Sequence, residues 1–377
     1  MVKKFCDILE IRNGKNQKAV ENPVGKYPIY GSGGLMGYAD DYICGANTVI
    51  IGRKGSINNP IFVTEPFWNV DTAFGLVADD TQILPRYLYY FCKNYNFEKH
   101  NKAVTIPSLT KADLLKIHID IPDLNVQFNV VEKLRKIENI INLKRQQISD
   151  FEELIKARFV EMFGDTEQNP MRWPVVSITE IIDGKVSNGF FAKRDEYRAD
   201  GNVQVLGVAN IVNRMYSNLK NLPRTDATQT DEEKYGVKYG DMLFCRSSLV
   251  AEGIGKASIV PKDTPNNVLF ECHVIRLPLD LQKCVPEFVQ VLSTTEFFRR
   301  QIIAQSKTAT MTTIGQDGIL KTTIILPPIE YQREFLRFVT QIDKSKVAVQ
   351  NFLLNRLYQA IIESIVLKMK GKKDGRF

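Results

Sequence analysis

Apolar residues recur at steps of three and four along two long stretches of the chain. The first stretch begins after Pro122 and reaches Gly164 without an internal glycine or proline, and charged residues occupy many of the remaining positions. Such spacing places one apolar stripe along one face of a helix. The second stretch begins after Pro328 and keeps the same rhythm through Leu336, Val339, Ile342, Val349, Leu353, Leu357, Ile361 and Ile365. The pattern predicts two long helices, over residues 122–164 and 327–370.

The two predicted helices start with matching motifs, "IPDLNVQ" at 121–127 and "LPPIEYQ" at 326–332. The motif proline and the motif glutamine each recur 205 positions later. The same offset relates Lys102 to Lys307, Thr105 to Thr310, Leu115 to Leu320, Ile119 to Ile324 and Ile137 to Ile342. An ungapped series of this kind indicates an internal duplication. Because one long helix cannot bury its stripe on itself, we expect an antiparallel pair; the alternative is two unrelated surface helices, each on its own domain.

Short β-prone runs separated by Gly, Asn and Pro turns precede each long helix. "NTVIIGRKGSINNPIFV" from Asn47 predicts strand, turn and strand, and "GDMLFCRSS" from Gly240 has a similar pattern. A shorter helix is expected after a proline in each region, from Leu84 and from Val285. The predicted order is a globule at 1–121, a helix at 122–164, a globule at 165–326, a helix at 327–370 and a basic tail at 371–377. The fold class is α+β: two globules of mixed helix and strand in tandem, separated by two long antiparallel helices that form a pseudo-twofold symmetric coiled-coil spacer.

The composition is that of a globular protein, with 44% hydrophobic and 25% charged residues in a chain of 377, long enough for two or three domains. The net charge of +7 permits a polyanionic partner without requiring one. The six cysteines form no C-x-x-C pair and there are three histidines, so free thiols are expected and a zinc site is not. Without a leader or a run of 18 apolar residues, we expect a cytoplasmic protein with no membrane partner.

No credible catalytic centre emerges from the motifs. "NNPIF" at 58–62 is similar to the N-P-P-Y/F loop of adenine-N6 methyltransferases, but Ile61 replaces the second proline. No F-x-G-x-G segment follows a strand to hold a methyl donor, so a β-turn is favoured. "GSGG" at 31–34 lacks the G-K-[ST] of a phosphate-binding loop and predicts a turn. We expect no catalytic residue and no metal ligand in this chain.

Basic, hydroxyl and amide side chains gather in the predicted loops. Lys, Ser and Thr are the types that hold phosphates, whereas Arg and Asn read base edges. Taken singly, each is more often a solvated loop residue, but their recurrence on two duplicated globules favours DNA binding. The candidates in the first globule are Arg53, Lys54, Ser56, Asn58, Asn59, Lys102, Thr105 and Ser108, with Arg53 leading. Those in the second are Asn188, Lys193, Arg194, Arg246, Ser247, Ser248, Lys307, Thr308, Thr310 and Thr313, with Arg246 leading; the alternative for either leading arginine is an ion pair inside its own domain.

The order globule, helix, globule, helix, with the two proline–glutamine motifs, resembles the specificity subunit of Type I restriction–modification systems over essentially the whole chain. The first motif has Asp123 where the family often has a second proline, and Asp can still cap a helix start. The resemblance implies a non-catalytic subunit that binds a bipartite DNA target, one half-site per globule. Because the two globules differ, the target is expected to be asymmetric.

The resemblance also implies the partners. These are double-stranded DNA, two methyltransferase subunits and two restriction subunits that act as motor and nuclease. No cofactor is expected in this chain; S-adenosylmethionine, ATP and magnesium would be held by the partners. One alternative is a separate target-recognition subunit of a related restriction–methylation enzyme (Type IIG/IIB-like). Another is a structural coiled-coil protein with two adhesive heads.

Overall fold

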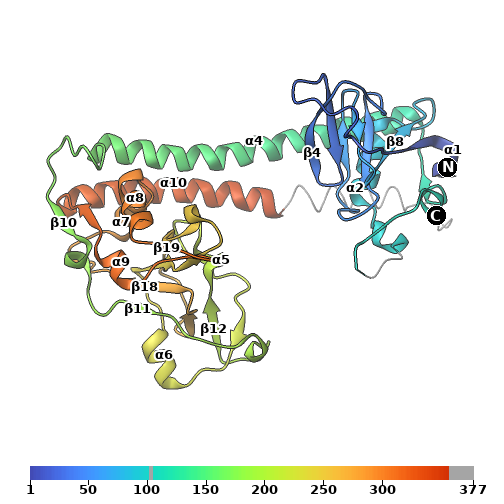
Figure 1. Cartoon of the computed structure of the whole chain (residues 1–377). Coiled ribbons are helices and arrows are strands. Elements are labelled where there is room, and N and C mark those ends of the chain that lie inside the picture. The colour runs from blue at the N-terminus through green and yellow to red at the C-terminus, as the bar shows by residue number, and fades with distance from the viewer. Residues whose placement is uncertain (102–104, 356–377) are drawn as a thin grey trace, which may run out of the picture. The chain divides into compact units, whose positions relative to one another are not determined.

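The computed structural model describes residues 1–101 and 105–355, which fall into two compact units (Figure 1). The main segments of these units are Met1–Arg145 and Gln146–Val349, called unit 1 and unit 2 below. The candidate Lys102, the positions Leu357, Ile361 and Ile365, and the tail at 371–377 lie outside the described residues. No helix in the described part of the chain is long and apolar enough to cross a membrane.

Unit 1 is built around a four-stranded antiparallel sheet. Its order is β2 (Leu9–Asn13), β8 (Ala73–Ala78), β5 (Thr48–Gly52) and β6 (Ile61–Val63). A second sheet has the order β4 (Gly34–Ala39), β3 (Tyr27–Gly31) and β7 (Trp68–Asn69), and β1 (Val2–Lys4) pairs with β9 (His118–Asp120). The helices are α1 (Phe5–Ile8), α2 (Pro85–Asn94), η1 (Phe97–His100) and α3 (Lys111–Leu114). Strand β5 is buried on both faces: Val49 and Ile51 join the α2 cluster, whereas Ile50 joins the cluster of Phe67, as the two-residue strand repeat requires.

Unit 2 contains a four-stranded antiparallel sheet of order β11 (Ser187–Asn188), β18 (Val274–Pro278), β14 (Asp241–Cys245) and β16 (Ala257–Ile259). Three smaller sheets are β13 (Arg224–Thr225), β12 (Val203–Leu206) and β17 (Val268–Phe270); β15 (Ser247–Ser248), β20 (Thr312–Thr313) and β19 (Lys307–Thr308); and β10 (Val175–Ser177) with β21 (Thr323–Ile325). The shorter helices are η2 (Ile178–Ile181), η3 (Arg194–Glu196), α5 (Val208–Ile211), α6 (Gln229–Tyr235), η4 (Ala251–Gly253), α7 (Pro286–Ser293), α8 (Glu296–Ala304) and α9 (Gln316–Leu320). The predicted short helices after Pro85 and Pro286 are present as α2 and α7.

The predicted long helices are present as α4 (Leu124–Phe163) and α10 (Ile329–Asn355). Within unit 2 their packed segments run antiparallel, as Figure 1 shows. An ion pair joins Arg158 to Glu334 at 3.3 Å, and another joins Glu152 to Lys346 at 3.4 Å. Residue numbers therefore increase in opposite directions along α4 and α10. Next to the first of these ion pairs, the rings of Phe159 and Phe335 pack edge to face, with their centres 5.6 Å apart. The expectation of an antiparallel pair is confirmed here.

The repeated glutamine of the helix-start motif ties each long helix to its globule. In unit 1 the Oε1 of Gln127 accepts a hydrogen bond from the backbone N–H of Leu84 at 2.9 Å, just before α2. In unit 2 the Oε1 of Gln332 accepts from the N–H of Val285 at 2.9 Å, just before α7. Each amide also donates Nε2 to the carbonyl of its own motif proline, and both side chains are fully buried. The glutamine therefore satisfies a backbone N–H that the first turn of α2 or α7 leaves without an intrahelical partner.

Candidate DNA interface

Two loop segments of unit 1 that are far apart in sequence form one surface. The turn after β5 places Lys54 in an antiparallel bridge with Ser108. The N–H of Leu109 donates to the carbonyl of Arg53 at 2.9 Å, and the N–H of Gly55 donates to the carbonyl of Pro107 at 3.0 Å. Gly55 has φ +81°, a left-handed conformation that glycine adopts without strain, and it lets the chain turn back. The pairing thus brings the two candidate segments, 53–56 and 105–108, onto one surface.

Unit 2 builds the same arrangement. Strand β15 follows Arg246 and pairs antiparallel with β20, with Ser247 opposite Thr313. Strand β20 also pairs with β19, which carries Lys307 and Thr308. The N–H of Ile314 donates to the carbonyl of Arg246 at 3.0 Å, and Ile314 stands 205 positions after Leu109, which makes the equivalent bond to Arg53. We call these two surfaces the paired-loop sites of unit 1 and unit 2.

The leading arginine of each site is held by weak contacts to backbone carbonyls. The Nη1 of Arg53 lies 3.5 Å from the carbonyl of Asp71, and its guanidinium stands 5.8 Å from the ring centre of Phe74. The Nη1 of Arg246 donates to the carbonyl of Cys272 at 3.2 Å. Neither arginine belongs to an ion pair in the part of the chain that the structure covers. A guanidinium has five N–H donors, so most of this donor capacity is available to a ligand.

Several other candidates are already engaged inside their own unit. The Oδ1 of Asn58 accepts from the N–H of Phe97 at 2.7 Å, and its Nδ2 lies 3.4 Å from the Oδ1 of Asn96. This amide therefore holds η1 against the turn. Asn59 is exposed in the same turn. Asn188 is half-buried in β11, where it pairs with Ile275 of β18.

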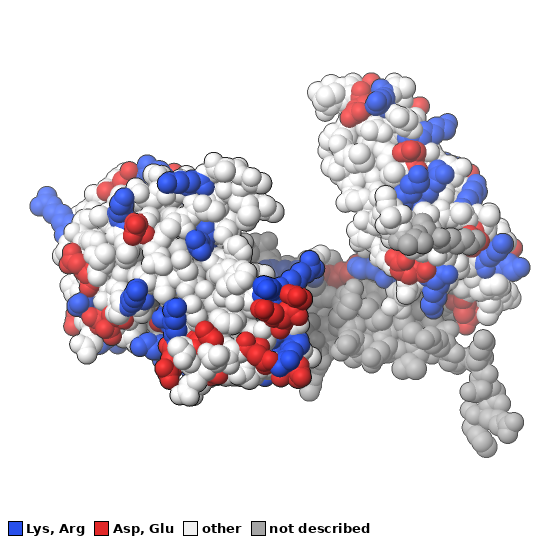
Figure 2. All heavy atoms as spheres, turned by 60° about the horizontal axis from the view of Figure 1, so that its bottom comes forward, with Lys and Arg blue, Asp and Glu red and all other residues white. Residues whose placement is uncertain are grey.

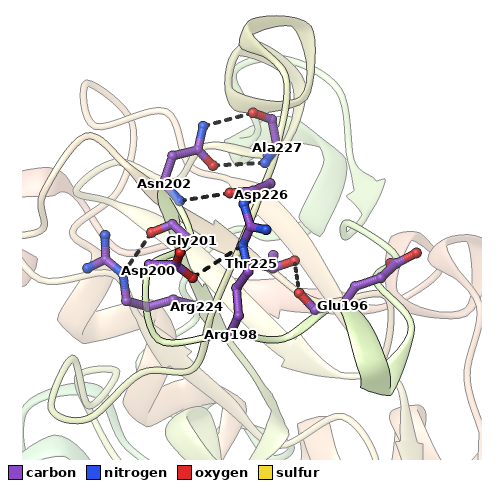
Figure 3. Close-up of polar contacts among 9 residues, drawn as sticks. All are labelled: Glu196, Arg198, Asp200, Gly201, Asn202, Arg224, Thr225, Asp226 and Ala227. Atoms are coloured by element: carbon purple, nitrogen blue, oxygen red, sulfur yellow. Dashed lines mark hydrogen bonds and ion pairs between the residues drawn. The ribbon is translucent and has the colours of Figure 1, made fainter.

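The remaining basic segment of unit 2 is anchored elsewhere. Lys193 and Arg194 are exposed at η3, and the chain that follows is tied to β13 (Figure 3). There Arg198 forms ion pairs with Asp226 and Asp200. In the same cluster the Oγ1 of Thr225 donates to the carbonyl of Glu196, and the Nε of Arg224 donates to the carbonyl of Gly201, both visible in Figure 3. Arg198 thus has a structural role, and the contacts of this segment are with β13 rather than with β15 or β20.

The structure adds residues to the unit 2 site that no sequence pattern indicated. The Nδ1 of His273 lies 2.9 Å from the Oγ of Ser247, and His273 is exposed in the turn between β17 and β18. Leu249 directly follows β15 and is 82% exposed, and Met311 between β19 and β20 is also exposed. Apolar side chains beside polar loops are suited to contact thymine methyl groups or to wedge between base steps. Only the pairing of strands reveals that these three residues share one site.

Positive and negative side chains are intermixed on the face of the molecule drawn in Figure 2. Lys and Arg alternate with Asp and Glu there, and broad areas carry neither. Any DNA contact on this face would therefore depend on individual side chains more than on a large basic field. Among the residues that the structure describes, no group of three or more His, Cys, Asp or Glu side chains is arranged to hold a metal ion. All six cysteines have free thiols.

Comparison with known proteins identifies the class. The family model described as Type I restriction modification DNA specificity domain matches residues 1–153 and again 170–359. The chain belongs to this family and carries its domain twice. The EcoKI specificity subunit of Escherichia coli (strain K12) is 22% identical over 344 residues, which cover 82% of this chain and 71% of that protein. The HindI specificity subunit of Haemophilus influenzae is 27% identical over 184 residues, which cover 46% of this chain and 37% of that protein.

A solved structure shares the fold. The S subunit of a Type I restriction–modification system from M. genitalium superposes with a TM-score of 0.55 at 13% identity. The superposition covers 98% of this chain and 95% of that chain. The resemblance seen in the helix-start motifs and the α+β class with tandem globules are thereby confirmed.

Proposed function

We propose that this chain is the DNA-recognition subunit of a Type I restriction–modification complex and that it reads a bipartite, asymmetric target. One observation carries the proposal. The same two-segment surface is built in each unit from the turn after a central strand and the segment that precedes the long helix. Each surface presents an arginine with spare donors beside lysine, serine and threonine, which suits base edges flanked by phosphates. The side chains differ between the two sites, so the half-sites should differ.

The chain would act as reader and scaffold, without catalysis of its own. Its partners would be double-stranded DNA, two methyltransferase subunits and two restriction subunits. The complex would act in the cytoplasm, where it meets DNA. S-adenosylmethionine, ATP and magnesium would belong to the partners. The broken "NNPIF" motif supports a chain without catalysis of its own. Pro60 leads directly into β6, a half-buried edge strand that pairs with β5, which is a structural use of the segment.

Mapping methylated adenines tests the proposal. In cells that carry the chain and its methyltransferase partner, we expect one two-part motif with a non-read gap, and no motif when the chain is deleted. A palindromic motif, or an unchanged methylation pattern after deletion, would contradict the proposal.

Calorimetry tests the non-catalytic role separately. The purified chain should take up no S-adenosylmethionine, whereas its complex with methyltransferase subunits should. Stoichiometric uptake of the methyl donor by the chain alone would overturn this part of the proposal.

A further inference from the structure

A basic groove in unit 2 is lined by none of the DNA-binding candidates that the sequence predicted. It is a cavity of about 460 Å³ between the paired helices and the second globule. Its charged lining comes from four different places: Lys156 and Glu152 on α4, Lys346 on α10, Arg214 and Lys256 on the globule, and Arg299 on α8. We call these six residues and the space between them the basic groove.

The cations of the basic groove are poorly compensated. Five Lys and Arg side chains line it, against the single carboxylate of Glu152. Glu152 pairs with Lys346 at 3.4 Å, and the Nζ of Lys256 donates to the neutral Oδ1 of Asn213 at 2.7 Å. Lys156 and Arg214 have no ion pair within the described part of unit 2. Like charges that converge in a cleft repel one another and concentrate counter-ions there, so a bound anion would relieve the repulsion.

Arg299 is fixed in a way that suits an anion site. Its Nη2 donates to the carbonyl of Ile254 at 2.6 Å and to that of Glu252 at 3.1 Å. Its Nη1 is buried without a hydrogen-bond partner in the described structure. Burial also lowers the pKa of this guanidinium, a sign that its charge is held away from water. Buried donors are nearly always satisfied in folded proteins, so the unsatisfied donor marks a place for an acceptor oxygen.

The chemistry of the groove favours phosphate over carboxylate. Lysine and arginine side chains from several directions match the distributed oxygens of a phosphate group, and arginine holds it with directed N–H donors. Ile155 and Val291 add apolar lining, against which a sugar or base could pack. The volume lies within the range of about 300–1,000 Å³ typical of ligand sites. We propose that the basic groove binds a phosphate group. This phosphate belongs either to the DNA backbone outside the recognised bases or to a free nucleotide.

The DNA version of this inference rests on the proposed function, whereas the nucleotide version does not. The test compares two variants of the full chain that lose the same charge. Lys156→Gln with Arg214→Gln removes two groove cations that make no side-chain hydrogen bond or ion pair within the covered residues. Lys185→Gln with Lys220→Gln removes two exposed lysines of unit 2 that do not line the groove. Matching thermal unfolding of both variants would confirm that neither has lost its fold.

Binding is then measured with a random-sequence duplex, with ATP and with inorganic phosphate. If the DNA backbone occupies the groove, the groove variant should bind the duplex roughly five- to tenfold more weakly. Its salt-dependence slope should also fall by about one to two, while the methylated motif stays the same. If a free nucleotide occupies it, ATP should bind the wild-type chain and the lysine control but not the groove variant, and duplex affinity should be unchanged.

Either result supports a phosphate site and names its source. The proposal of a phosphate site would be overturned if the groove variant and the lysine control bound each of the three probes with equal affinity. A wild-type chain that binds no duplex would contradict the proposed function instead, and the ATP and phosphate titrations would still decide the groove.

Discussion

At the scale of single residues, Arg53 and Arg246 have equivalent positions in the two paired-loop sites. If Arg53 reads a guanine, Arg53→Ala should weaken DNA binding by about 1–3 kcal/mol and relax one half-site, the cost of losing a bidentate contact. Arg246→Ala should relax the other half-site. Binding titrations against duplexes with single base changes would measure both effects.

Arg198→Ala is the matched control, since that guanidinium is already engaged by Asp226 and Asp200. It should lower thermal stability and leave the recognised motif intact. If Arg53→Ala behaved in the same way, with unchanged DNA affinity and a lower melting temperature, then Arg53 would be a structural residue.

Asp343 on α10 gives a prediction about pH. Burial raises the pKa of its carboxyl, Lys346 opposes the shift and Glu287 adds to it. A raised pKa means that the folded chain binds the proton more tightly than the unfolded chain, whose aspartates titrate near about 3.9. Stability therefore falls as the pH rises from about 4 through the raised pKa. Asp343→Asn should be more stable than wild type at neutral pH, and the advantage should disappear in acid.

Urea unfolding at acid and neutral pH would check this sign. Asp280→Asn is the opposite control, because backbone hydrogen bonding from Gln282 and contact with Lys283 lower the pKa of Asp280. A carboxyl whose pKa is lowered by folding stabilises the folded chain when the pH is above the pKa of the unfolded chain. This stabilisation is lost as the pH falls through the lowered pKa. Asp280→Asn should thus be less stable than wild type at neutral pH, whereas Asp343→Asn should be more stable than wild type. Equal effects of the two substitutions would contradict the burial argument.

At the scale of elements, the buried glutamine determines where each long helix meets its globule. Gln332→Ala would leave the N–H of Val285 and the carbonyl of Pro327 without their side-chain partner in a site with no exposed surface. An unsatisfied buried group costs about 1–3 kcal/mol. We expect a loss of this size in the free energy of unfolding of unit 2, measured in urea.

Gln341→Ala on the exposed face of the same helix should cost little. Gln332→Glu is more informative than alanine, because it keeps an acceptor for Val285 but has no N–H to donate to Pro327. It should also destabilise unit 2. A Gln332→Ala chain as stable as Gln341→Ala would show that the glutamine does not fix this junction.

At the scale of the whole molecule, each unit has its own hydrophobic core. The main cluster of unit 1 extends from Phe5 to Val131 of α4, so the start of the long helix belongs to the core that a domain exchange would replace. Exchanging residues 1–145 with another family member should therefore keep the equivalent of the hydrogen bond that Leu84 donates to Gln127, and yield a stable chain. Mapping of methylated adenines should then reveal one altered half-site and one unaltered half-site.

An exchange limited to residues 1–121 separates Gln127 and Val131 from the core on which they pack. It should give the same altered half-site in a less stable protein. Alteration of both half-sites by either exchange would mean that the two units do not read DNA independently.

The sequence by itself determined the features that depend on local periodicity and on the duplication. An apolar stripe repeats at the helical period, so α4 and α10 could be predicted, and a fixed offset of 205 positions related the two halves. The repeated glutamine was visible in the sequence as a motif. The hydrogen bond that it accepts from a backbone N–H 43 or 47 positions earlier was not visible there.

Only the tertiary structure decided which loops lie together and which polar groups remain available. Strand pairing joins Arg53 to the segment of Ser108. The amide of Asn58 is engaged by Phe97 and Asn96, and Arg198 pairs with Asp226, which follows β13, and with Asp200. The basic groove draws its cations from α4, α8, α10 and two loop or strand positions of the globule, between residues 156 and 346. Such contacts depend on how distant segments are brought together, and neither residue type nor spacing encodes that pairing. For this reason the class of protein could be recognised from sequence, whereas the membership of each site required the fold.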